Sequence, residues 1–130
     1  MSTTEQLAQR IANNPFLGFL KLRGAERQGT VAQLPFEPLL KNHVGTLHAG
    51  ALFTLAHTSA LAALPQAQAM SLTGFDSSIV FKRPSKGPVW ASSEVLGSTS
   101  EHTEIKTTIF SEANEPLVEF NIRFESRGSA

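Results

Sequence analysis

The chain has 130 residues, 41% of them hydrophobic, and its 11 basic and 11 acidic residues leave no formal net charge. This length predicts a single domain over residues 1–130 with enough apolar side chains for a core, and the charge balance argues against a protein built mainly to bind nucleic acid. The chain has no cysteine, which excludes disulfides, thiolate metal ligands and a cysteine nucleophile.

The N-terminal segment predicts a short helix. Ser2 to Gln6 forms a capping-box pattern, and apolar side chains follow at helical spacing up to Ala12. Asn13 to Pro15 then ends the helix. The segment lacks the basic start and apolar stretch of a signal peptide, so we expect a cytoplasmic protein.

Two extended segments are predicted next. Phe16 to Arg23 alternates in part between apolar and charged residues, and Gly24 to Gly29 has the composition of a turn. Thr30 to Phe36 is the second extended segment, and the prolines around its end predict that it stops there.

The segment from about Thr46 to Leu64 predicts one long helix, which Pro65 closes. It is rich in Ala and Leu and has no strongly charged face, which is typical of a buried helix. His48, Thr54 and His57 interrupt its apolar run, so we do not expect it to span a membrane.

The remainder of the chain predicts four strands joined by short turns. The predicted strands are Leu72 to Pro84, Val89 to Leu96, His102 to Phe110 and Leu117 to Phe124. Because the links are short, neighbouring strands should be antiparallel.

The last strand alternates most clearly between two faces. Val118, Phe120, Ile122 and Phe124 share one face, and charged or polar residues alternate with them. A sheet with one dry face needs a cover, and the long helix is the only segment of suitable size. The sequence therefore predicts an α+β hotdog fold, a six-stranded antiparallel sheet wrapped around one long central helix.

The long helix and the segment before it carry a motif. The pattern N-x5-H-x-G-x-L-F-x-L-A, beginning at Asn42, and the strand Ser77 to Ser85 with its Arg-Pro pair resemble hotdog acyl-CoA thioesterases of the phenylacetyl-CoA thioesterase type. The resemblance implies an enzyme acting on a small or medium acyl-CoA, with no metal and no cofactor beyond the coenzyme A of the substrate. It also implies a homodimer, with the possibility of a dimer of dimers, and sites between subunits.

The sequence departs from the family pattern at two positions. The family has an acidic residue eight positions after its oxyanion-hole residue, and this position is His57 here. The oxyanion-hole residue, often Gly in the family, is Ala49. The first departure matters more, because the family carboxylate is the proposed base or nucleophile.

Thioester hydrolysis requires a polarised carbonyl oxygen. The first N–H groups of a helix have no intrahelical partners and carry the positive end of the helix dipole. The candidates are the N–H groups of His48, Ala49 and Gly50. The alternative is an ordinary helix start with no catalytic role.

Helix geometry separates the two histidines of this segment. At about 100° per residue, the step from His48 to His57 turns about 900°, so the two side chains point to opposite sides of the helix. A metal site formed by this pair within one chain is therefore not expected. A shared site needs a second copy of the helix, as in a two-fold dimer. The resemblance implies that arrangement, with Asn42, His48 and Ala49 of one chain facing His57 of the other.

His57 itself has two interpretations. A neutral imidazole can act as general base on a water molecule near neutral pH, and burial keeps the ring neutral. Alternatively, His57 is a buried histidine bonded to a backbone carbonyl, Thr54 or Thr58.

Other polar residues are weaker candidates. Asn42 could bind the acyl carbonyl or a water, but Asn is also a common turn residue. The helper hydroxyl of the family corresponds to Thr73. Phe53 is expected to contact the acyl-CoA. Further candidates, for contact with the phosphates of coenzyme A, are Lys82, Arg83 and Lys86. The alternative is that these exposed charges at a strand end are simply solvated.

Two rival functions remain open from the sequence. One is a non-catalytic acyl-CoA or acyl-lipid binding protein that has lost its catalytic acid at His57. The other is a hotdog dehydratase or hydratase, which the absence of a His-plus-acid pair on the helix disfavours. We expect no nucleic-acid or membrane partner.

Overall fold

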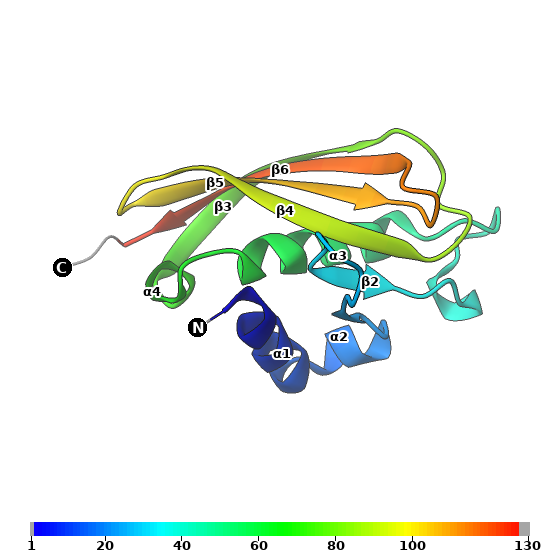
Figure 1. The fold of residues 1–130 in the computed structure, drawn as a ribbon, viewed down its shortest axis with the longest axis horizontal. Helices are drawn as coiled ribbons and strands as arrows, with labels where there is room; N and C mark the ends of the chain where they lie inside the picture. Colours follow the sequence, from blue (N-terminus) through cyan, green and yellow to red (C-terminus); the bar gives the residue numbers. More distant parts are fainter. Residues whose placement is uncertain (1, 128–130) are drawn as a thin grey trace.

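The computed structural model describes residues 2–127 and has three layers (Figure 1). A six-stranded antiparallel sheet arches over helix α3 (Ala49–Ala62), and helix α1 (Thr3–Asn13) packs on the other side of α3. Neighbours on both sides explain how a helix with almost no polar face is stable here. The predicted hotdog arrangement is confirmed.

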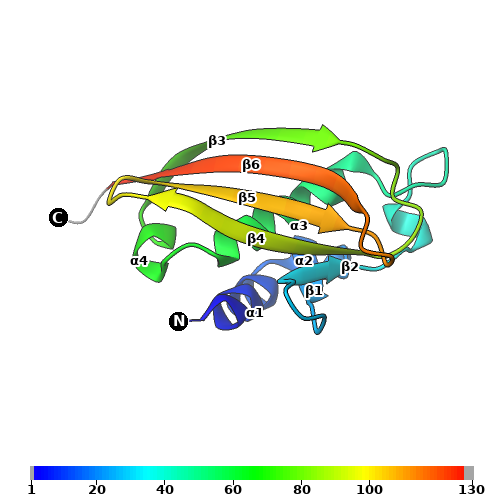
Figure 2. The ribbon, with the colours of Figure 1, turned by 45° about the horizontal axis from the view of Figure 1, so that its top comes forward.

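The sheet places the strand after α3 at one edge. The strands are β1 (Arg23–Gly24), β2 (Ala32–Leu34), β3 (Leu72–Phe81), β4 (Val89–Ser98), β5 (His102–Phe110) and β6 (Pro116–Ser126). Their order is β1-β2-β4-β5-β6-β3, and all neighbours are antiparallel. In Figure 2, β3 borders β6 on one side and no other strand of the described residues on the other.

Strand β6 has the two faces that the sequence predicts. Val118, Phe120, Ile122 and Phe124 are buried, whereas the residues between them are half-buried or exposed. Phe120 is the centre of this dry face, because it pairs with Thr107 of β5 and Ile79 of β3 and its ring meets Phe53 of α3 edge-on at 5.4 Å.

Helix α3 is shorter at both ends than predicted. It begins at Ala49 because His48 is its N-cap residue, with extended backbone, and it ends at Ala62 with Ala63 as C-cap. A short helix, α4 (Gln66–Ala69), follows, and a 3-10 turn, η1 (Pro38–Leu40), precedes the α3 loop. Within residues 2–127, none of the helices combines the length and apolar character needed to span a bilayer.

Helix α1 begins as predicted, but the strand predicted after it is wrong. Ser2 caps α1, since its hydroxyl accepts a hydrogen bond from the Glu5 N–H at 3.1 Å. The Asn14 side chain accepts from the Phe16 N–H at 3.1 Å and starts a second helix, α2 (Pro15–Phe19), with proline in its first turn.

The alternation that predicted a strand from Phe16 to Arg23 has another cause. Leu20 and Leu22 are buried and Lys21 is exposed, yet Lys21 has φ of 58°, which a strand does not allow. Only Arg23 and Gly24 pair with β2. A turn that buries alternate side chains therefore reproduced the pattern of a strand.

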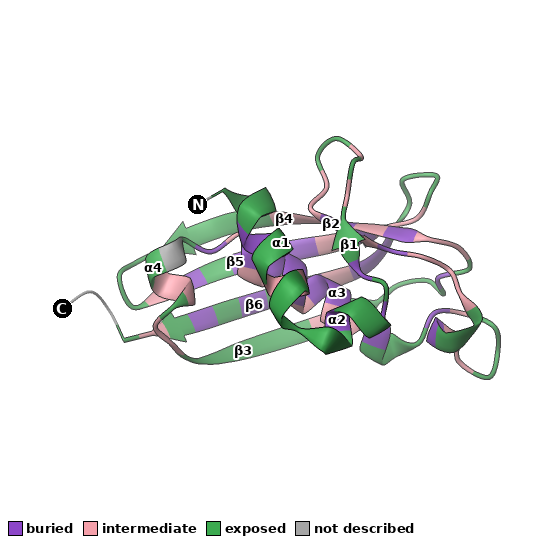
Figure 3. Cartoon of the chain, turned by 90° about the horizontal axis from the view of Figure 1, so that it is seen from below, coloured by how far each residue is buried: buried purple, intermediate pink, exposed green. Residues whose placement is uncertain are grey.

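The edge strand β3 is largely exposed. Figure 3 shows β3 coloured as exposed along most of its length, whereas β5 and β6 carry buried bands under the helices. Phe75 is 49% exposed, Val80 55% and Phe81 45%. A long edge strand with exposed apolar side chains invites pairing with another chain.

The burial of Phe120 predicts a large loss of stability on truncation. Phe120→Ala should lower the free energy of unfolding by about 3–5 kcal/mol, because it leaves a cavity between the sheet and α3. Asn121→Ala, on the exposed face of the same strand, should change it by less than about 0.5 kcal/mol. Denaturant unfolding measures both, and equal effects would mean that the two faces of β6 are misassigned.

Candidate active site

The loop before α3 is organised by Asn42. Its side-chain oxygen accepts from the N–H groups of Val44 at 3.0 Å and Thr46 at 3.1 Å, and its amide donates to the Thr46 hydroxyl at 2.8 Å. Gly45, with φ of 83°, allows the chain to turn back. The turn interpretation of Asn42 thus accounts for most of its hydrogen-bonding capacity, and one amide N–H remains for a ligand.

The first turn of α3 leaves one backbone N–H without a partner among the described residues. The His48 N–H donates to the Leu40 carbonyl at 2.8 Å, and the Gly50 N–H donates to Nδ1 of His48 at 2.9 Å. The exposed Ala49 N–H forms no hydrogen bond in this part of the chain. Of the three candidate oxyanion donors, Ala49 is the one that a substrate could use without displacing an existing bond.

Gly50 allows His48 to close over the helix start. A Cβ at position 50 would lie 3.1 Å from Nδ1 of His48, which is tighter than an ordinary contact. The bond from the Gly50 N–H also requires an unprotonated Nδ1, so the neutral ring carries its proton on Nε2. His48 therefore acts as the helix cap in the free chain.

His57 lies two turns further along α3, among aromatic rings. Its ring stacks on Phe53 with centroids 5.9 Å apart and lies 4.9 Å from Phe75 of β3 and 6.0 Å from Phe124 of β6. Neither ring nitrogen is hydrogen-bonded within residues 2–127, which differs from the structural role considered for His57. Burial, and then the positive charge of Arg10, lower the pKa of His57.

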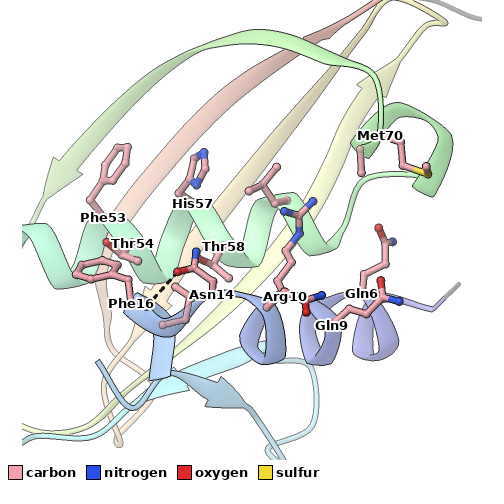
Figure 4. A pocket seen from close by; sticks show the side chains of 14 residues that line it. Gln6, Gln9, Arg10, Asn14, Phe16, Phe53, Thr54, His57, Thr58 and Met70 are labelled. Atoms are coloured by element: carbon pink, nitrogen blue, oxygen red, sulfur yellow. Dashed lines mark hydrogen bonds between the residues drawn. The ribbon is translucent and has the colours of Figure 1, made fainter. Parts of the chain in front are cut away.

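Helix α1 is fixed to the C-terminal end of α3 by one buried amide. The Gln6 side chain donates to the carbonyls of Leu64 at 2.8 Å and Ala62 at 3.3 Å, both at the end of the long helix. Arg10 lies one turn further along α1 on the same face, and its side chain rises toward α3 (Figure 4). This docking places Arg10 close enough to His57 to affect its charge.

A cavity of about 840 Å³ opens between α1, α2 and the side of α3 that carries His57 (Figure 4). In Figure 4 the Arg10 side chain rises from α1 toward α3, while Phe53 and His57 leave α3 side by side. The apolar part of the wall includes Phe53 and the polar part includes His57. Other lining residues include Gln9, Asn14, Phe16, Thr54 and Met70.

The remaining predicted site residues lie on the sheet and its end. Thr73 is exposed at an irregular position of β3, where the pairing register shifts between Leu72 and Gly74. Lys82 is paired with Glu119 at 2.9 Å, and this hydrogen bond lowers the pKa of Glu119.

The other two basic residues of this end differ from each other. Arg83 is paired with Glu115, whereas Lys86 is exposed and has no ion-pair partner in the described part of the chain. Lys86 is therefore the cation of this group that an anionic ligand would reach at least cost. No group of three or more His, Cys, Asp or Glu residues is arranged to hold a metal ion within residues 2–127.

Three residues near the site were missed from the sequence. Arg10 and Phe75 reach His57 only through the docking of α1 and the pairing of β3, which no local pattern indicates. Ser85, whose carbonyl accepts from the Leu47 N–H at 3.0 Å, has the one buried hydroxyl without a hydrogen bond in the described residues. A lone Ser after an Arg-Pro pair gives no signal of this position.

Comparisons with solved structures identify the fold. The PaaI protein of E. coli, from the phenylacetic acid degradation operon, superposes with a TM-score of 0.77 at 17% identity over 99% of both chains. A thioesterase from Haemophilus influenzae gives 0.79 at 19% identity, covering 98% of this chain and 92% of that one. A Bacillus halodurans protein solved with CoA gives 0.71 at 14% identity, covering 95% and 85%.

These likenesses confirm the fold that the sequence motif indicates. Neither the models of known families nor the curated proteins give a match to the chain. At such low identities the structural matches carry the hotdog fold, in which thioesterase-superfamily proteins are the neighbours, and leave the chemistry to be argued from the site.

The lowered pKa of His57 predicts a loss of stability in acid. In the unfolded chain this ring has its ordinary pKa, so the unfolded state binds the proton first as pH falls. The parent should therefore lose stability as pH drops through the ordinary pKa of His, about 6.5, until the folded pKa is passed. His57→Gln, a neutral side chain at every pH, should remove that part of the dependence.

Denaturant unfolding of both proteins between pH 8 and pH 4.5 measures this difference. The other three histidines are common to both chains and cancel in the comparison. Curves that run parallel over the whole range would show that His57 has the same pKa folded and unfolded.

Proposed function

We propose that this chain hydrolyses the thioester of a small or medium acyl-CoA, at a site that two copies of the chain build together. The observation that carries the proposal is the unbonded N–H of Ala49 at the start of α3, in a fold whose neighbours are thioesterase-superfamily proteins. Such a donor stabilises the charge that develops on a thioester oxygen under attack, and removing one typically costs about 100- to 1000-fold in rate.

The distance between the two key groups requires the second copy. Ala49 and His57 are eight residues apart on one helix, which is about 12 Å along the axis at 1.5 Å per residue. One carbonyl group cannot contact both groups, because each must come within about 3 Å of the reacting atoms. Ala49 of the partner subunit can meet His57 only if the helices of two copies lie side by side.

The exposed edge of β3 supports such a dimer. A two-fold axis beside this strand would extend the sheet across both copies and cover Phe75 and Phe81, which are exposed on its helix side in the single chain. Helix α3 runs alongside the sheet (Figure 2). The same two-fold axis would reverse the second α3 relative to the first, which would bring its N-terminus toward the middle of the first helix. A dimer of dimers is compatible with this arrangement.

The chemistry proposed for the site is water activation. The neutral His57 imidazole takes a proton from a water molecule, whose oxygen attacks the thioester carbonyl carbon while Ala49 of the partner subunit donates to the carbonyl oxygen. The tetrahedral intermediate then breaks its C–S bond. The thiolate leaves and takes the proton from His57, and the acid is released.

The environment of His57 suits a base. Burial and the Arg10 charge keep the ring neutral, and the aromatic rings around it leave its nitrogens without protein partners in residues 2–127. Phe53 forms part of the apolar wall for the acyl group. Asn42, through its remaining amide N–H, and Thr73 are the further polar groups that we assign to the substrate or the water.

The coenzyme A end of the substrate would lie near the start of α3. The Bacillus halodurans neighbour was solved with CoA, which supports a CoA ester as ligand here. Lys86 is the most available cation for a phosphate, because it has no ion-pair partner in the described residues. Lys82 and Arg83 would first have to break their ion pairs with Glu119 and Glu115. The reaction needs no cofactor, since coenzyme A enters as part of the substrate, and we expect it in the cytoplasm.

The competing function is binding without hydrolysis. The family's acidic residue is replaced by His57, and a site without its base would still hold an acyl-CoA or acyl-lipid. The two functions differ in a single measurable property, namely whether thiol is released.

The test is thiol release from a panel of acyl-CoAs by the parent and His57 variants. The rate should rise with pH through the lowered pKa of His57 and then level off, because only the neutral ring accepts a proton. His57→Ala should lose about 100-fold or more in rate while CoA-ester binding stays largely intact. His57→Asp should keep or raise activity, since it restores the family's carboxylate.

Each alternative gives a different pattern. Thiol release by His57→Ala at the parental rate would exclude His57 as the base. No turnover by the parent, with unchanged ligand binding in His57→Ala, would support the binding protein instead.

A further inference from the structure

The cavity beside His57 is lined by a positively charged side chain and by no negatively charged one among its described residues. The lining contains Arg10, but no Asp or Glu is among its described residues. Side-chain amides accompany the guanidinium, from Gln9 and Asn13 of α1 and Asn14 after it. All these groups can donate hydrogen bonds, which is the composition of a site for an anion.

Arg10 has no partner that explains its position. Within residues 2–127 it forms no hydrogen bond and no ion pair, although its side chain is half-buried. Holding a guanidinium partly out of water without a counter-ion is unfavourable, and a bound carboxylate offsets that cost with two parallel hydrogen bonds. The attraction between Arg10 and the end of the α1 dipole is a weaker effect that leaves its five N–H donors unused.

We propose that Arg10 recognises a carboxylate at the far end of a short acyl chain, so that the substrates are thioesters of dicarboxylic acids. This inference rests on the proposed function, because it takes His57 as the position of the thioester. Arg10 and His57 line the same cavity, which we assign to the acyl side of that thioester. The phosphates of coenzyme A lie beyond the pantetheine arm on the other side of the sulfur.

The lining of the cavity agrees with an acyl group that has a polar end. Phe16, Phe53 and Met70 supply apolar wall for methylene groups, and Arg10 with the amides supplies the polar end. A purely aliphatic acyl chain would leave these donors without acceptors.

The experiment compares two acyl groups of similar size, glutaryl-CoA with a terminal carboxylate and pentanoyl-CoA with a terminal methyl. The parent should favour glutaryl-CoA in kcat/KM by about 10- to 100-fold, the range expected for a charge-assisted hydrogen bond. Arg10→Gln should lose that preference by reducing kcat/KM for glutaryl-CoA alone, and Arg10→Lys should retain part of it. Arg23→Gln, an exposed arginine of β1 away from the cavity, is the matched control and should behave as the parent.

Two results would overturn the inference. Equal losses for both substrates in Arg10→Gln would mean that Arg10 supports the fold, the dimer or the coenzyme A end. Repeating the comparison with pantetheine thioesters, which lack the nucleotide phosphates, identifies the last case, because the effect of Arg10→Gln would then disappear. A parental preference for pentanoyl-CoA would also contradict it.

Binding measurements separate this inference from the proposed function. If no thioester is hydrolysed, the proposed function fails, but non-hydrolysable thioether analogues of the two ligands still measure the preference by calorimetry. If the parent binds the carboxylate analogue more tightly than the methyl analogue and Arg10→Gln does not, the carboxylate site is supported even then. If the parent and Arg10→Gln bind the carboxylate analogue with equal affinity, the site is excluded.

Discussion

The long helix α3 has packed neighbours on both sides and ends in the protein interior, so the carbonyls of its last turn need partners within the protein. The amide of Gln6 provides them at the C-terminal end, where it donates to the carbonyls of Ala62 and Leu64. At the N-terminal end, Nδ1 of His48 accepts from the Gly50 N–H. Satisfying both ends fixes α1 on one side of the helix and the loop before it on the other, and it leaves the Ala49 N–H for a ligand.

The same constraint sets the electrostatics of the cavity. Because Gln6 holds α1 against the end of α3, Arg10 lies one turn further along α1 and its side chain points toward α3. Its charge and the burial of the ring lower the pKa of His57, so this histidine is neutral where a carboxylate would be charged. A neutral His57 leaves the Arg10 guanidinium without a counter-ion within residues 2–127. The neutrality of His57 therefore affects both the proposed base and the ligand charge that the cavity can accept.

The sequence predicted the elements whose signal is periodic and long. The long helix was found because its long segment is rich in Ala and Leu, and the four strands after it because extended runs alternate with short turns, most clearly from Val118 to Phe124. The segment from Phe16 was misread because Asn14 and Pro15 start a short helix, and the turn after it buries Leu20 and Leu22 on either side of an exposed Lys21. Arg10 could not be found, since its role depends on how α1 docks on α3, and docking leaves no mark in the local pattern.

The site residues divide in the same way. The helix start and His57 follow from the motif and from helix geometry within one segment. The rings of Phe75 and Phe124 around His57 depend on strand pairing at long range, and the proposed contribution of a second chain has no signal in the local pattern.

The central claim is that each site combines His57 of one subunit with the Ala49 N–H of the other, and hybrid dimers test it most directly. Ala49→Pro removes that N–H at the first helical position, where proline is tolerated, and His48 already has the extended backbone (φ −65°, ψ 138°) that a following proline requires. Heterodimers of Ala49→Pro and His57→Ala chains, purified with two tags, contain one intact site if the sites are shared. We expect the heterodimer to have about half of the parental kcat per dimer, and the Ala49→Pro and His57→Ala homodimers to be inactive. A heterodimer as inactive as the two homodimers would contradict the shared site.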